Sequence, residues 1–192
     1  MMDFTILVNK DNLLPRDYVP EGLVEIHEPT GSKIDKTYVN KLNKQAYDAF
    51  KEMQKDALKA GYEIFVDSSY RTYDYQERVF NHIVAEKGLE HAKKYVALPG
   101  GSEHQTGLAV DVIFRRNNEM IEEQKEDDPE IMWLFSNAHK YGFILRFPKG
   151  KENITGVNFE PWHFRYVGKK ISEELFSSDM TLEEYSNLQK SK

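Results

Sequence analysis

The sequence predicts an α+β fold, in which strands with mixed connections pack against helices. Two observations support this prediction. Apolar residues recur at helical spacing in several segments, and short apolar runs bounded by turn residues lie between them, as expected for buried strands. The chain has 192 residues without an internal repeat or a low-complexity linker, so at about 150 residues per domain it predicts one domain over residues 1–192.

The N-terminal third is predicted to contain an extended segment, a helix and a strand. Residues 1–34 contain several prolines and are expected to lie extended over the surface. Asp35 is a suitable N-cap, and the apolar residues after it recur at helical spacing until Gly61, which predicts a helix between these two positions. The apolar run 63–66 then predicts a buried strand.

The rest of the chain continues in the same way. A helix is predicted over 73–87 with Thr72 as its N-cap, and another is predicted to begin at Pro129, which suits the first helical turn. Residues 115–128 are polar and acidic, which is typical of an exposed insertion, and a capping box at 181–184 predicts a short C-terminal helix. Three further strands are predicted from apolar runs: 108–114, 143–147 and 158–167.

The composition excludes several classes of protein. The chain has no cysteine, which excludes disulfides, thiol nucleophiles, iron–sulfur clusters and cysteine-based zinc sites. Its formal net charge of −6 provides no basic footprint for nucleic acid. No window approaches the roughly 18 apolar residues of a membrane span, and no signal-peptide pattern is visible. We therefore expect a cytoplasmic protein that binds no nucleic acid and does not span a membrane.

The strand predicted over 108–114 contains one carboxylate, Asp111, among apolar residues. Burying an unpaired carboxylate is costly, so Asp111 requires either a metal ion or an arginine as its partner. An arginine partner would make a buried ion pair that serves the structure alone. His104 precedes this strand in a glycine-rich segment, and His163 lies within an aromatic strand.

Two histidines and one carboxylate form a set that suits Zn²⁺. With His104, Asp111 and His163 as protein ligands, a fourth position stays open for water, whose pKa zinc lowers to about 7. Glu160 is then the candidate general base, three residues before a ligand. Residues three apart in a regular strand point to opposite faces, but Pro161 favours an irregular backbone that lets both face one site. Three other histidines are expected in solvated or helix-capping roles: His82, His91 and His139.

Three spaced motifs resemble those of the VanY family of zinc D,D-peptidases. They are Ser-x-His-x-x-Gly-x-Ala-x-Asp over 102–111, Glu-x-x-His over 160–163, and an upstream arginine motif over 68–72 with Gln76. The resemblance covers roughly residues 36–170 and is strongest to the VanXY-type enzymes of vancomycin resistance. It implies a small central antiparallel sheet with flanking helices, similar to the hedgehog signalling domain.

The resemblance implies one zinc ion per chain on the ligands named above, with Glu160 as the base, and it assigns further roles. Arg71 would stabilise the tetrahedral oxyanion, and Ser102 and Gln76 would hold the free carboxylate of the substrate. The implied substrates are the D-Ala-D-Ala dipeptide and the C-terminal D-Ala of peptidoglycan-precursor pentapeptides. On the residues alone, Ser102 could instead cap a turn, Gln76 could be a solvated helix residue, and Arg71 could be the structural partner of Asp111.

Other functions fit parts of the same pattern. An iron(II) oxygenase also uses two histidines and a carboxylate, but its carboxylate normally follows the first histidine by two residues, and here the gap is seven. A non-catalytic wall-binding module would need neither Glu160 nor Arg71. A carboxypeptidase exported to trim mature peptidoglycan would use the same residues. The acidic segment 119–130 contains seven carboxylates and one lysine, and it is either a solvated loop or a lid at the rim of the site.

Overall fold

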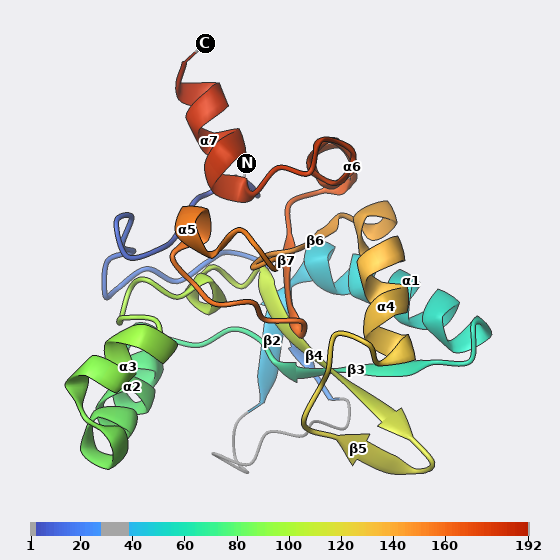
Figure 1. Cartoon of the computed structure of the whole chain (residues 1–192), viewed down its shortest axis with the longest axis horizontal. Helices are drawn as coiled ribbons and strands as arrows, with labels where there is room; N and C mark the ends of the chain where they lie inside the picture. The colour runs from blue at the N-terminus through green and yellow to red at the C-terminus, as the bar shows by residue number, and fades with distance from the viewer. Residues whose placement is uncertain (1–2, 28–38, 192) are drawn as a thin grey trace.

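The computed structural model describes residues 3–27 and 39–191 (Figure 1). Its strands are β1 (Leu23–Ile26), β2 (Asn40–Asn43), β3 (Glu63–Ser68), β4 (Ala109–Arg116), β5 (Glu119–Ile121), β6 (Phe143–Leu145) and β7 (His163–Tyr166). Its α-helices are α1 (Lys44–Lys59), α2 (Tyr73–Lys87), α3 (Leu89–Tyr95), α4 (Pro129–Asn137), α5 (Glu152–Thr155), α6 (Lys169–Ser178) and α7 (Leu182–Lys190), and its 3-10 helices are η1 (Glu103–Thr106) and η2 (Ala138–Tyr141). No helix within the described ranges has the length and apolar character needed to cross a membrane.

The main sheet is antiparallel, which confirms the predicted α+β class. Strands β3, β4, β7 and β6 lie side by side in that order, and β5 pairs with the C-terminal end of β4. Strands β1 and β2 form a separate antiparallel pair. In Figure 1, α1 and α4 lie together on one side of the main sheet, whereas α2 and α3 pack against each other on the opposite side of the view.

The two faces of the central strands differ in polarity, and this difference places the site. Three alternate residues of β4 belong to the main hydrophobic core together with side chains of α1 and α4: Val110, Val112 and Phe114. Because side chains alternate along a strand, Asp111 lies on the opposite face. Strand β7 has the same arrangement, with Phe164 in the core and His163 on the opposite face. The sheet therefore has one apolar face and one face that carries ionisable groups.

The first helix begins later than predicted. The expected N-cap Asp35 lies outside the described residues, and residues 40–43 form β2, which pairs with β1. Asn43 is the observed N-cap, since its side-chain oxygen accepts a hydrogen bond from the backbone N–H of Gln45 at 2.9 Å. Leu42 of β2 is buried and continues the apolar spacing of α1, so the periodicity alone did not separate the strand from the helix.

Several predicted elements are confirmed with small changes in their bounds. The apolar runs 63–66 and 108–114 correspond to β3 and β4, and α2 begins after Thr72, whose hydroxyl accepts a hydrogen bond from the N–H of Tyr75 at 3.1 Å. Helix α4 begins at Pro129, and α7 begins with the predicted capping box. The three helix starts were predicted correctly because their capping residues give a strong local signal in the sequence.

The structure corrects the prediction for the segment before β7. The strand predicted over 158–167 is limited to the four residues of β7. Residues 146–162 form an irregular segment that contains α5 instead of a simple turn. Helices α3 and α6 were not predicted, because they are short and each contains few apolar residues.

The acidic residues 115–128 are partly built into the sheet. Strand β4 continues to Arg116, Asn117–Asn118 form a tight turn with left-handed φ values of 53° and 66°, and the chain returns as β5. Arg116 then holds the following segment through ion pairs with Asp128 at 2.9 Å and Glu130 at 2.5 Å. The first part of the predicted insertion is thus a β-hairpin formed by the end of β4 and β5. The last part of the insertion is held against this hairpin by the ion pairs of Arg116.

Candidate metal centre and active site

Strand pairing brings Asp111 and His163 together. Strand β4 pairs with β7 so that Asp111 lies directly opposite His163 on the polar face of the sheet. The Nδ1 atom of His163 lies 2.8 Å from Oδ1 of Asp111. These two residues are 52 positions apart in the sequence, and the sheet register alone places them in contact.

His104 reaches the same point from η1. The 3-10 turn ends at Gly107, whose φ of 67° suits glycine and directs the chain into β4. The Nδ1–H of His104 donates to the backbone carbonyl of Ser69 at 2.6 Å, since a carbonyl can only accept. Its Nε2 therefore keeps a free lone pair, and this atom lies 3.3 Å from Oδ2 of Asp111.

The three side chains fit a zinc ion. One ligand atom from each of His104, Asp111 and His163 lies within 4.8 Å of the others. Imidazole nitrogens and a carboxylate oxygen are ordinary zinc ligands, and three of them leave the open position that a catalytic site needs. The geometry thus brings together the three residues that the sequence predicted as ligands.

Electrostatics favour this role. Burial raises the pKa of Asp111, but the imidazoles of His104 and His163 outweigh it and hold that pKa well below its usual range. Burial also lowers the pKa of His104, which keeps the ring neutral. Burial likewise opposes the charged form of His163, yet its contact with Asp111 and other nearby carboxylates raises its pKa to about 9. A metal ion would displace the proton on the Asp111 side of that ring.

Glu160 lies beside the ligand cluster, as predicted. The N–H of His163 donates to the carbonyl of Glu160 at 3.2 Å, so residues 160–163 form a turn and not a strand. This confirms the irregular backbone expected at Pro161, and it brings Oε2 of Glu160 within 4.0 Å of Nδ1 of His163. Burial raises the pKa of Glu160 to about 6. The residue is a carboxylate at neutral pH with an increased affinity for a proton.

Arg71 contacts both the ligand cluster and α2. Its Nη2 atom lies 3.1 Å from Oδ2 of Asp111 and 2.7 Å from Oγ of Ser68, and its Nη1 lies 3.5 Å from Oε1 of Gln76. The contact with Asp111 is the one that the structural alternative required. The guanidinium also lines the cavity in front of the ligands, as the catalytic assignment required.

The two predicted substrate-binding residues lie in the same cavity wall. Gln76 is buried in α2 and donates from Nε2 to the carbonyl of Ala97 at 2.9 Å, so it is not a solvated helix residue. Ser102 is also buried, and its side chain makes no capping hydrogen bond to η1. The simple structural roles considered for these two side chains are therefore not the ones observed.

All seven predicted site residues line one cavity of about 510 Å³. Its other walls come from the N-terminal segment around Asn9, the end of α3, and residues 155–158. The acidic segment 119–130 contributes no lining residue, which favours the solvated loop over the lid. The remaining histidines lie elsewhere: His27 and His82 pair with exposed carboxylates, His91 packs against Tyr95, and His139 stacks on Phe176.

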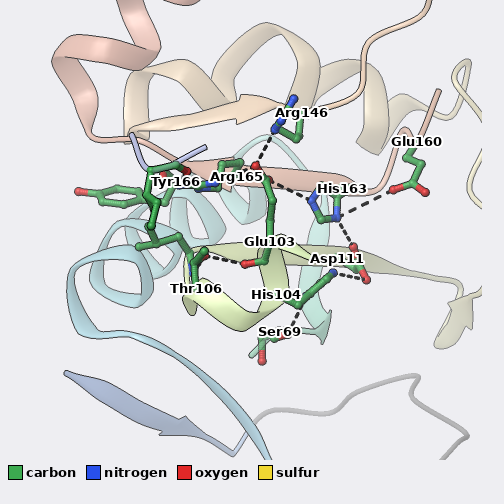
Figure 2. A network of polar contacts seen from close by, with 12 residues as sticks. Ser69, Glu103, His104, Thr106, Asp111, Arg146, Glu160, His163, Arg165 and Tyr166 are labelled. Carbon is green, nitrogen blue, oxygen red and sulfur yellow. Dashed lines mark hydrogen bonds and ion pairs between the residues drawn. The ribbon is translucent and has the colours of Figure 1, made fainter. Parts of the chain in front are cut away.

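Sequence reasoning missed a buried charged network behind His163, shown in Figure 2. Oε1 of Glu103 accepts hydrogen bonds from Nε of Arg146 and Nη1 of Arg165, each at 2.8 Å. Both arginine side chains are 0% exposed. Arg165 was detectable in principle, because it stands between two aromatic residues of a strand, whereas Glu103 and Arg146 look like ordinary surface charges in the sequence.

Comparisons with known proteins identify the family of this chain and several relatives. Residues 39–169 match the family described as VanY, D-alanyl-D-alanine carboxypeptidase. The putative carboxypeptidase YodJ of Bacillus subtilis (strain 168) is 46% identical over 181 residues, which is 93% of this chain and 65% of the relative. The bifunctional D-Ala-D-Ala dipeptidase and D-Ala-D-Ala carboxypeptidase VanXYC of Enterococcus gallinarum is 43% identical over 118 residues, which is 60% of this chain and 62% of the relative. The chain thus spans less than two thirds of the length of these relatives.

Solved structures share the fold. The LdcB LD-carboxypeptidase has a TM-score of 0.84 at 44% identity, with 94% of this chain and 84% of that chain covered. A mutant of the D,D-pentapeptidase VanY from a VanB-type resistance cassette, in complex with Zn(II), has a TM-score of 0.79 at 30% identity, with 96% and 99% covered. Both are peptidases, and one of them was observed with zinc.

Proposed function

The chain belongs to the VanY family of D-alanyl-D-alanine carboxypeptidases, and from that premise we propose that it is a zinc-dependent D,D-peptidase with one zinc ion per chain. The proposed substrates are the D-Ala-D-Ala dipeptide and the C-terminal D-Ala of peptidoglycan-precursor pentapeptides. One observation supports this above all: His104, Asp111 and His163 converge within 4.8 Å, with Glu160 beside them in one cavity.

The chemistry follows from the residues of the site. Zinc, when bound, supplies a Lewis acid that polarises the scissile carbonyl and lowers the pKa of water to about 7. Glu160 accepts a proton from the attacking water and passes it to the nitrogen of the leaving D-Ala. Its raised pKa of about 6 suits both steps, since the group is ionised at neutral pH yet holds a proton well enough to deliver it.

The guanidinium of Arg71 would stabilise the negative charge that develops on the carbonyl oxygen. Gln76 accepts from Arg71 and donates to a backbone carbonyl, so it holds that guanidinium in place and has one N–H left for the substrate. Ser102 supplies a hydroxyl from the same wall for the free carboxylate of the terminal D-Ala.

An L,D-carboxypeptidase is the second candidate. The observation that favours it is the likeness to LdcB, which is 44% identical, whereas the VanY structure is 30% identical. Both activities remove a C-terminal D-Ala and differ in the configuration of the preceding residue. The same metal, base and arginine serve both, so the difference lies in the wall that contacts that preceding residue.

Release of free D-Ala from three peptides tests these proposals. The zinc-loaded protein is assayed on D-Ala-D-Ala, on a pentapeptide ending in D-Ala-D-Ala, and on a tetrapeptide in which an L-residue precedes D-Ala, with Glu160→Gln as the control. We expect release from the first two peptides. Release from the pentapeptide alone would refute the dipeptidase activity, release from the tetrapeptide alone would establish the second candidate, and no release would refute both.

We also propose that the protein is cytoplasmic, where the soluble peptidoglycan precursors occur. Cell fractionation tests this location.

A further inference from the structure

Two buried polar atoms face each other behind the metal centre. Nε2 of His163 and Oε2 of Glu103 are both fully buried, and neither has a hydrogen-bond partner among the described residues. They lie 3.7 Å apart, and Figure 2 shows the Glu103 carboxylate directed at the ring of His163. A buried polar atom without a partner costs about 1–3 kcal/mol, so two such atoms side by side require an explanation.

The explanation lies in which nitrogen of His163 binds a metal ion. Nδ1 is the atom on the side of the other ligands, 2.8 Å from Oδ1 of Asp111. If Nδ1 gives its lone pair to the metal, the ring proton must be on Nε2, and that proton needs an acceptor. For His104 the corresponding acceptor is the carbonyl of Ser69, at 2.6 Å. Glu103 is in the corresponding position for His163.

The surroundings of Glu103 leave one of its oxygens free for this purpose. Arg146 and Arg165 both donate to Oε1, each at 2.8 Å. The Glu103 side chain is only 2% exposed and both arginine side chains are 0% exposed, so the carboxylate cannot turn to solvent. The two guanidinium groups thus offset the cost of burying the carboxylate and fix its orientation, with Oε2 toward His163.

We propose that Glu103 is a positioning residue for His163. When a metal ion is bound, Oε2 of Glu103 accepts the Nε2–H of His163, which holds the ring in the tautomer that binds through Nδ1 and raises the basicity of that nitrogen. The inference rests on the proposed zinc site and extends it, because Glu103 is not one of the three ligands. It predicts an effect on metal affinity, which can be measured without any assay of activity.

Glu103→Gln tests the proposal, and Glu183→Gln is its matched control. Glu183 of α7 accepts hydrogen bonds from Nη1 and Nη2 of Arg146 at 2.8 and 2.6 Å, so each variant removes one charge from the same network with little change in size. Of these two glutamates, Glu103 faces His163 and Glu183 does not. In Glu103→Gln the amide oxygen is needed by the two guanidinium groups, so the NH₂ group faces Nε2 and favours the wrong tautomer.

The dissociation constant for zinc is measured by competition with a chelator, and the melting temperature is measured on the same samples. We expect zinc binding about 10–100-fold weaker in Glu103→Gln and unchanged in Glu183→Gln, with a lower melting temperature in both. Equal zinc affinity in the two variants would overturn the proposal while leaving the zinc site intact. A wild-type protein that binds no zinc would refute the proposed function and this inference together.

A measurement on the unmodified protein decides the matter if Glu103→Gln does not fold. Ring ¹⁵N spectra of the zinc-loaded protein distinguish a metal-bound nitrogen from a protonated one. We expect Nδ1 of His163 to be metal-bound and Nε2 to be protonated. A zinc-bound Nε2, or a ring proton on Nδ1, would overturn the assignment of Glu103.

Discussion

Replacing Glu160 by glutamine should separate proton transfer from metal binding. The amide has nearly the same size as the carboxylate but cannot accept a proton at neutral pH. Glu160 lies outside the group of three candidate ligands, with its nearest oxygen 4.0 Å from His163, so zinc content should not change. Loss of a general base costs about 10²–10⁴-fold in kcat, equivalent to about 3–5 kcal/mol in the activation barrier.

The pH profile provides a second signature of the same residue. Burial raises the pKa of Glu160 to about 6, and the charge of a bound zinc ion would lower it again, so the acid limb should lie at or below about pH 6. The ionised carboxylate is the active form, so activity is lost as the pH falls through this pKa. Below the limb, kcat/KM should decrease about tenfold per pH unit in the wild type. Glu160→Gln should lack this limb.

The assay measures D-Ala release between pH 5 and pH 8 over a range of substrate concentrations, so that kcat and kcat/KM are both obtained, with the zinc content of each sample determined in parallel. Glu173→Gln, an exposed substitution on α6, is the control for a change of charge alone. Normal turnover in Glu160→Gln, or an acid limb that persists in it, would refute the assignment of the base. Loss of zinc from this variant would show that Glu160 is a ligand instead.

Three further predictions address the ligands and the arginine. His104→Ala and His163→Ala should each lose zinc after dialysis, and undiminished zinc in both would refute the ligand assignment. Because the pKa of His163 is raised to about 9 in the metal-free protein, the ring is protonated at pH 7.5. Calorimetry in two buffers should therefore show release of at least about one proton per zinc bound, to which ionisation of a zinc-bound water would add. No release would contradict this. Arg71→Ala should lower kcat by about 10²-fold or more with zinc retained. A change in KM alone would indicate ground-state binding, and loss of folding would favour the structural pair with Asp111.

The residues of the metal centre could be predicted because each stands in a local pattern that its chemistry explains. Asp111 interrupts an apolar strand. In the structure its neighbours Val110 and Val112 face the hydrophobic core, whereas the side chain of Asp111 lies on the opposite face of the sheet. Pro161 indicated an irregular backbone, and the turn at 160–163 confirms it. In both cases the signal lies within a few residues of the site.

Contacts between distant segments could not be predicted in this way. Glu103 meets Arg165 across 62 positions, and nothing in the sequence near either residue indicates the other. The start of α1 was misplaced for the same reason, since residues 40–43 are a strand only because β1 pairs with them. Local periodicity describes the chain segment by segment, whereas these features depend on partners from elsewhere in the fold.

The alignment of β4 with β7 has a consequence for the folding of the sheet. Asp111 and His163 are cross-strand neighbours on the polar face, between core residues such as Val110 and Phe164 on the other face. A slip of one residue in this pairing would turn Asp111 into the apolar core and expose Val110. A carboxylate buried there without a partner would be strongly destabilising. The ionisable groups of the site thus also discriminate against mispaired strands, so that only the correctly aligned sheet is stable.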